Sequence, residues 1–206
     1  EEKGIYSIEK FIIARRLMYW QVYLHKTVIS AEFCLIKLLQ RAKELTLNGE
    51  KLFASEPLQY FLKKNINNNY DEEILENFLL IDDDDIMVSA KSWMNHKDKI
   101  LSTLAKNLIN RNLPKILLQK EKFDEEEINI KKEKISKLMN ISLKDTDYFV
   151  YQDTISNYTY SDNNDTNIRI LFNDNQVKDI TEASDIFNIS ALLTIEKKYF
   201  LCYPRE

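Results

Sequence analysis

The first quarter of the sequence is a long segment without any helix-breaking residue. No proline or glycine occurs between residues 7 and 46, and large apolar residues recur there at helical spacing. Gly49 follows at the point where a helix end is expected. We therefore expect one long helix over residues 7–46, and a mostly α-helical first half of the chain.

Shorter elements are expected to follow this helix. The pattern predicts helices near residues 58–63, 72–80, 85–94 and 97–110, and after Pro114 strands at 115–119, 148–152, 168–172 and 198–203. Helices are expected from about 125 to 139 and from Thr181 or Ser184, with a polar loop over 161–167. The second half thus has the order β-α-β-β-α-β, which fits a ferredoxin-like domain. The predicted fold class is mostly α followed by a small α+β domain, divided into residues 1–113 and 114–206.

Composition excludes several classes of protein. Gly4 and Gly49 are the only glycines, so no glycine-rich phosphate loop can form and the P-loop and dinucleotide-binding classes are excluded. The net charge of -4 disfavours a protein that coats nucleic acid. No apolar run approaches the ~20 residues that span a bilayer. Cys34 and Cys202 lie in apolar surroundings, so buried free thiols in a reducing, cytoplasmic compartment are expected.

The long helix carries a row of cations and phenols. Each residue of an α-helix turns by about 100°, so residues three, four or seven positions apart lie near one line. The row consists of Arg15, Tyr19, Tyr23 and Lys26, with His25 beside it. Arginine and lysine suit phosphate oxygens, and tyrosine offers a flat ring and a hydroxyl to a base or sugar. The row is a candidate nucleotide-binding face, although packed helices also use such residues to bind neighbouring carboxylates, and a lone histidine is often a core residue.

Two segments resemble one known family. The stretch ARRLMYWQVYLHKTV resembles the helix that follows the metal site in HD-superfamily phosphohydrolases of the deoxynucleoside triphosphate triphosphohydrolase branch, which carries an R-x(7)-Y-x-H-K pattern. Residues 109–116, INRNLPKI, are similar to the R-N-L-x-K element that ends the helical domain of that family. The intervening DDDDIMVSAKSW resembles its acidic turn and following helix, and residues 114–206 fit its extra α+β domain. The resemblance spans most of the chain and implies the C-terminal half of an HD-type fold.

The resemblance implies a role for each residue of the row. Arg15 and Lys26 would contact the phosphates of the substrate, and Tyr23 the sugar or base, while His25 belongs to the matching pattern. Tyr19 departs from the family pattern, in which a histidine is expected at this position, so the resemblance implies no proton-transfer role for Tyr19.

The second segment implies a separate site. Arg111 and Lys115 would belong to a regulatory nucleotide site or to a subunit interface. The alternative is a pair of cations at a helix C-terminus, where the helix dipole favours positive charge.

The metal ligands of that family have no counterpart here. The family holds a divalent metal with a His, a His-Asp pair and a later Asp, whereas this chain has His25 and His96, each followed by lysine. Asp82–Asp85 lack the spacing of a calcium loop, and we expect them to cap the next helix. Mg²⁺ or Mn²⁺ is therefore expected to be bound by residues upstream of this chain, which alone would hold no metal and be inactive, as the C-terminal part of a longer enzyme.

Two function classes remain. The first is the nucleotide-binding part of a phosphohydrolase that converts a dNTP to deoxynucleoside and triphosphate, in a homo-oligomer. The second is a non-catalytic nucleotide-binding or oligomerisation module. Single-stranded nucleic-acid binding through Tyr148, Phe149 and Tyr151 is disfavoured by the acidic balance.

Overall fold

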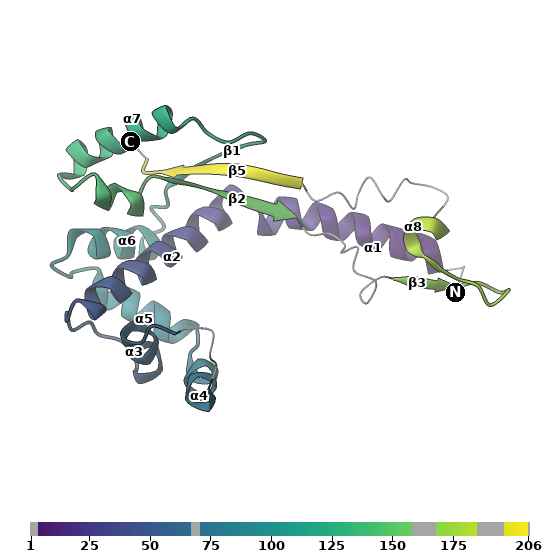
Figure 1. The fold of residues 1–206 in the computed structure, drawn as a ribbon, viewed down its shortest axis with the longest axis horizontal. Helices are drawn as coiled ribbons and strands as arrows, with labels where there is room; N and C mark the ends of the chain where they lie inside the picture. Colours follow the sequence, from purple (N-terminus) through teal and green to yellow (C-terminus); the bar gives the residue numbers. More distant parts are fainter. Residues whose placement is uncertain (1–3, 67–70, 158–167, 185–195, 206) are drawn as a thin grey trace. The chain divides into compact units, whose positions relative to one another are not determined.

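The computed structural model describes residues 4–66, 71–157, 168–184 and 196–205 (Figure 1). Helices dominate this part of the chain and a small α+β region follows them, which confirms the predicted class. The chain divides into two compact units. Unit 1 comprises Glu1–Val28, Leu117–Phe123 and Gln152–Leu201, and unit 2 comprises Ile29–Ile116, Asp124–Tyr151 and Cys202–Glu206. The expected boundary between residues 113 and 114 falls inside unit 2, and the domains 1–113 and 114–206 stay a prediction.

The helix expected over residues 7–46 is interrupted. Helix α1 (Ile5–Met18) passes into a one-turn π-helix, Tyr19–Tyr23, and α2 (Lys26–Leu47) begins after it. The amide of Leu24 donates to the carbonyl of Tyr19, five residues back, at 2.8 Å. The prediction of one continuous helix was therefore wrong. A π-turn lengthens the hydrogen-bonded ring by only one residue and requires neither glycine nor proline, so no helix-breaking residue marks it in the sequence.

The core of unit 1 forms between α1 and a short hairpin. Strands β3 (Arg169–Leu171) and β4 (Val177–Asp179) pair antiparallel, and α8 (Ile180–Ala183) follows. The apolar side chains packed together are Ile5, Ile8, Ile12, Ile168, Ile170, Phe172, Ile180 and Ala183. Glu9 is buried on the same helix and accepts a hydrogen bond from the Ser184 hydroxyl. The sequence does not predict β4, because its residues show no alternation of apolar and polar side chains.

Unit 2 contains the predicted shorter helices, each within two residues of its expected ends. They are α3 (Glu56–Lys63), α4 (Glu72–Leu80), α5 (Asp83–Trp93), α6 (Lys99–Ile109) and α7 (Glu125–Met139). Aspartates accept backbone N–H bonds at the starts of α4 to α7, which explains why these ends are predictable. No helix in the described ranges is both long and apolar enough to cross a bilayer.

Helices α2 and α6 pack together in unit 2. The Cys34 thiol of α2 donates to the Leu104 carbonyl of α6 at 3.7 Å, and Leu38 and Leu104 are almost fully buried. Cys34 and Cys202 are both buried free thiols, as expected. Burial raises the pKa of the Cys34 thiol to about 11 and that of Cys202 to about 12, which keeps both thiols protonated and unreactive.

A three-stranded sheet has the order β1-β5-β2. Its strands are β1 (Lys115–Gln119), β5 (Glu196–Tyr203) and β2 (Tyr151–Asn157), and β2 starts later than expected because 144–148 form a 3₁₀-helix. The strand expected at 168–172 is β3, which pairs with β4 in a separate sheet. Within the described residues the strands therefore do not form the single four-stranded sheet of a ferredoxin-like domain, because β3 pairs with the neighbouring β4 and not with β1, β5 or β2. The loop expected over 161–167 lies outside the described residues.

Candidate functional site

Three side chains of the predicted row contact one another in unit 1. The Arg15 guanidinium donates from Nη2 to the Tyr19 hydroxyl at 3.1 Å, and its central carbon lies 5.0 Å from the centre of the Tyr19 ring. The rings of Tyr19 and Tyr23 lie 5.0 Å apart, tilted by 44°. Arg15 and Tyr19 are half-buried, whereas Tyr23 is 52% exposed. One cation and two phenols are thus held together with an edge open to solvent. We call these three residues the Arg15 cluster.

A cation packs on the same π-helix. The ammonium group of Lys198, on β5, lies 3.8 Å from the centre of the Trp20 ring, and both residues belong to unit 1. A cation over an indole contributes about 0.5–2 kcal/mol, more when water is excluded. This contact stabilises the π-helix that carries Tyr19 and Tyr23. The sequence does not predict this contact, because two residues so far apart in the chain leave no local pattern.

His25 and Lys26 lie outside the Arg15 cluster. His25 is exposed, so it is not the core histidine that its residue type favours, and its Nδ1 accepts a hydrogen bond from the amide of Thr27 at 3.2 Å. This bond satisfies one of the free N–H groups at the start of α2. Lys26 is exposed at the first position of α2, and no hydrogen bond, ion pair or ring contact joins its side chain to another described residue. A role for these two residues in substrate binding stays a prediction.

Arg111 has an unusual backbone conformation at the end of α6. Its φ is +56°, and it follows the C-cap residue Asn110. The amide of Arg111 donates to the carbonyl of Leu108 at 3.2 Å, and the amide of Asn112 donates to that of Asn107 at 2.8 Å. These bonds make a Schellman motif, in which glycine usually occupies the position of Arg111. The exposed Arg111 side chain therefore projects from a left-handed residue just beyond the helix.

Replacing Arg111 with glycine is expected to stabilise the chain. A positive φ costs a residue with a side chain about 1 kcal/mol or more, and glycine pays no such steric cost. We expect Arg111→Gly to raise the free energy of unfolding, measured by urea denaturation, by about 0.5–1 kcal/mol. This net gain is smaller than the steric gain, because the substitution also removes a favourable positive charge at the helix C-terminus. Asn140→Gly, at φ +49° after α7, is the matched control and should gain less, because asparagine tolerates this region. Lower stability of Arg111→Gly would contradict the prediction.

Lys115 begins β1 and faces an aromatic ring. Its Nζ lies 5.8 Å from the centre of the Tyr203 ring, and the Nζ of Lys131 lies 4.6 Å from the same point. Arg111 and Lys115 are both exposed in unit 2, but no contact joins them among the described residues. Their shared role in a regulatory site or a subunit interface stays a prediction.

The described residues do not fit the divalent metal of the family that the sequence resembles. Among them, no three His, Cys, Asp or Glu side chains gather closely enough to hold an ion. The Nδ1 of His96 accepts a backbone amide bond. In the acidic run, Asp82 accepts bonds from the amides of Asp84 and Asp85, and Asp85 accepts one from the amide of Asp82, so the run caps α5 as predicted. No chemical step through a metal is therefore assigned to this chain.

Arg41 is the centre of a polar cluster that sequence analysis missed. Its guanidinium binds both carboxylate oxygens of Asp98, at 3.2 and 2.6 Å, and donates to Glu44 at 2.8 Å. The Tyr148 hydroxyl donates to the same Glu44 oxygen at 2.6 Å. The cluster joins α2, the start of α6 and the 3₁₀-helix Lys144–Tyr148. Because each of these polar groups is bonded to another member of the cluster, we interpret it as a structural element of unit 2.

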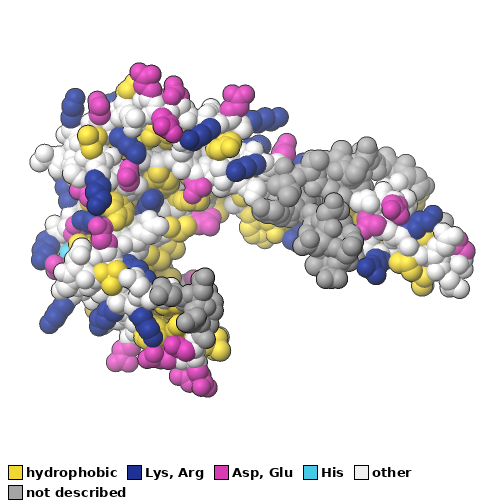
Figure 2. All heavy atoms as spheres, in the orientation of Figure 1, with side chains coloured by type: hydrophobic (Ala, Val, Ile, Leu, Met, Phe, Trp, Pro, Cys, Tyr) yellow, Lys and Arg dark blue, Asp and Glu magenta, His cyan; other side chains and the backbone are white. Residues whose placement is uncertain are grey.

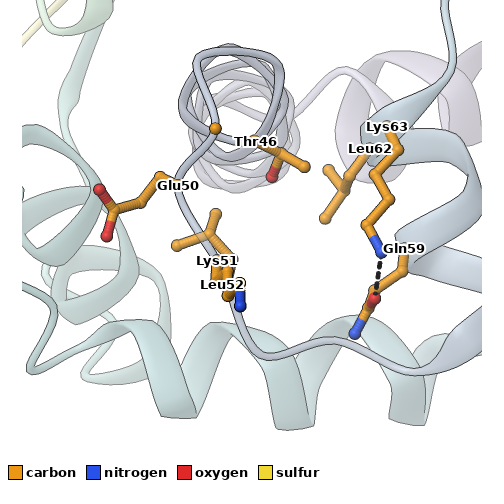
Figure 3. Close-up of a pocket in the computed structure, with 8 residues that line it drawn as sticks. Thr46, Glu50, Lys51, Leu52, Gln59, Leu62 and Lys63 are labelled. Carbon is orange, nitrogen blue, oxygen red and sulfur yellow. Dashed lines mark hydrogen bonds between the residues drawn. The ribbon is translucent and has the colours of Figure 1, made fainter.

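A cavity of about 450 Å³ lies at the C-terminal end of α2 (Figure 3). Its wall includes Thr46, Glu50, Lys51, Gln59, Leu62 and Lys63. The Lys63 ammonium donates to the Gln59 side chain at 2.7 Å, as drawn in Figure 3, and Glu50 pairs with Lys97 at 3.0 Å. Glu50 is thus already ion-paired and Lys63 already hydrogen-bonded, and no predicted site residue lines the cavity. We assign no ligand to this cavity.

The whole chain is similar to part of two longer proteins. It is 48% identical to a phosphohydrolase of known structure from Bacteroides thetaiotaomicron, with a TM-score of 0.89, and the match covers 100% of this chain and 51% of that protein. It is 28% identical over 214 residues to the uncharacterized protein YwfO of Bacillus subtilis, covering 100% of this chain and 46% of that protein. No protein-family model matches the chain. The chain therefore spans about half the length of these relatives and shares the fold of the corresponding part of the Bacteroides protein.

Proposed function

We propose that this chain is the substrate-binding part of a phosphohydrolase of the HD superfamily, which converts a dNTP to deoxynucleoside and triphosphate. The 48% identity to a phosphohydrolase over the whole chain supports the general class. The HD class and the dNTP substrate rest on the sequence patterns around Arg15 and Arg111. The observation that carries the binding role is the Arg15 cluster, which lies where a π-helix interrupts α-helix, a feature frequent at functional sites.

The Arg15 cluster suits a nucleotide in two ways. A phosphate oxygen binds a guanidinium more strongly than a neutral hydroxyl does, so the substrate is expected to replace the Tyr19 hydroxyl as the partner of Arg15. The exposed ring of Tyr23 offers a surface to the sugar or base. Lys26 and His25 add an exposed cation and an exposed imidazole at the start of α2. In this proposal Mg²⁺ or Mn²⁺ is held by residues outside the chain.

A chimeric enzyme tests the proposal. This chain is joined to the part of the Bacteroides phosphohydrolase that it does not match, and each of the four dNTPs is supplied with Mg²⁺ or Mn²⁺. We expect release of inorganic triphosphate, and its loss in Arg15→Ala. The intact Bacteroides protein, assayed in parallel, controls for the conditions. A folded chimera that leaves all four dNTPs intact would refute the enzymatic proposal.

A second candidate is a non-catalytic nucleotide-binding or oligomerisation module. Arg111 favours it, because an exposed arginine in a conformation that normally takes glycine suggests a role other than stability. On this hypothesis, Arg111 and Lys115 bind a regulatory nucleotide or a neighbouring subunit of a homo-oligomer. This candidate predicts that nucleotides stabilise the chain against heat, or that its mass in solution rises with concentration. Either effect should be lost in Arg111→Ala. Such a loss, together with a chimera that hydrolyses no dNTP, would favour the non-catalytic module.

A further inference from the structure

Helix α4 presents large apolar side chains that are more than half exposed in the described part of the chain. The exposed fractions are 56% for Leu75, 65% for Phe78, 73% for Leu79 and 67% for Leu80. Ile74, on the same helix, is buried and ties α4 to unit 2. Single exposed apolar residues are normal on a protein surface, but a contiguous group marks an interaction site.

The spacing of these residues makes one continuous surface. Leu75, Phe78 and Leu79 stand at positions i, i+3 and i+4, so their side chains are neighbours on one side of the helix. We call these three residues the α4 face. It is a short apolar stripe of the kind that receives another amphipathic helix.

Acidic residues neighbour the α4 face along the sequence. Eight acidic residues and no lysine or arginine occur between residues 71 and 90, namely Asp71, Glu72, Glu73, Glu76 and Asp82–Asp85. Figure 2 shows acidic side chains in magenta beside apolar ones in yellow at the lower end of the view, where Figure 1 places α4. Glu73 pairs with Lys64 at 3.1 Å, whereas Glu72 and Glu76 are exposed and have no ion-pair partner among the described residues. The surface thus combines an apolar centre with unneutralised negative charge.

We propose that the α4 face docks a basic amphipathic helix of a partner protein. The apolar side of such a helix would cover Leu75, Phe78 and Leu79, and its lysines and arginines would pair with the surrounding carboxylates. A second copy of this chain would instead bring two acidic rims together, and juxtaposed like charges oppose association. Charge complementarity therefore selects a basic partner over self-association. The proposal is independent of the proposed hydrolase function.

A pair of synthetic peptides tests this surface. The first is a helical peptide with leucines at i, i+3, i+4 and i+7 and lysines at the other exposed positions, and the second replaces every lysine with glutamate. In fluorescence anisotropy we expect the chain to bind the basic peptide, less tightly as salt is added, and not to bind the acidic peptide. Leu79→Ser is expected to weaken binding at least about tenfold, because the apolar centre is lost. Glu72→Gln with Glu76→Gln is expected to weaken it and reduce its salt dependence.

The matched controls lie on α7 in the same unit. Leu138 is 69% exposed and Glu133 is exposed. Leu138→Ser and Glu133→Gln therefore remove similar groups from a surface that is not part of the proposed docking site. Both should bind the basic peptide as the unchanged chain does. Equal binding by Leu79→Ser would mean that charge alone holds the peptide, and it would overturn the proposal. Absence of binding, or a dimer of the chain that Leu79→Ser dissociates, would overturn it as well.

Discussion

Arg41→Ala is expected to lower the free energy of unfolding by about 3 kcal/mol. The side chains of Arg41 and Asp98 are only 14% and 16% exposed, so the bidentate pair is largely removed from water. Removing the cation leaves the Asp98 carboxylate buried without its partner, and Glu44 loses one of its donors. Urea denaturation followed by circular dichroism measures the effect. Lys64→Ala, which breaks the exposed pair with Glu73, is the control and should change stability little.

The same pair gives this prediction a pH dependence. Burial alone would raise the pKa of Asp98, but the bonds from Arg41 and from the amide of Leu101 outweigh burial and lower the pKa below its ordinary value of 3.8. A carboxyl group with a lowered folded-state pKa contributes stability that is present above its unfolded pKa and is lost as the pH falls through the folded one. The difference in stability between the unchanged chain and Arg41→Ala should therefore narrow below about pH 4. A difference that stays constant down to pH 2 would contradict this origin.

Arg15→Ala is expected to weaken nucleotide binding by the isolated chain about 10- to 150-fold. A hydrogen bond to a charged group contributes about 1.5–3 kcal/mol, which corresponds to that range of affinity. Isothermal titration with each dNTP measures it. Lys10→Ala removes an exposed cation from the same helix and is the matched control.

Two further variants separate the parts of this site. Arg15→Lys keeps the charge without the planar fork and should bind with intermediate affinity. Tyr19→Phe removes the hydroxyl that Arg15 binds at 3.1 Å, and it should not weaken binding if phosphate replaces that hydroxyl. A loss in Tyr19→Phe as large as in Arg15→Ala would contradict the exchange of partners, and unchanged affinity in Arg15→Ala would remove the Arg15 cluster from the proposed site.

Local signals in the sequence determined most helices. Asp71, Asp98 and Asp124 cap their own helices through bonds to amides two or three residues away, and such bonds depend only on neighbouring residues. The contacts of Arg15 with Tyr19 and of Tyr19 with Tyr23 followed from the four-residue spacing for the same reason.

Tertiary structure decided the features that depend on distant partners or on backbone conformation. The Lys198 contact on Trp20 and the Arg41 pair with Asp98 each join residues that no short pattern connects. The π-turn after Met18 and the left-handed Arg111 are also hidden, because neither glycine nor proline marks them. The sequence by itself therefore determined most of the helical segments and the row on which Arg15, Tyr19 and Tyr23 meet. It also placed Lys26 on that row, whereas the structure leaves Lys26 outside the cluster. Contacts between residues that are distant in the sequence, such as that of Lys198 with Trp20, decided where the long helix breaks and what stabilises the break.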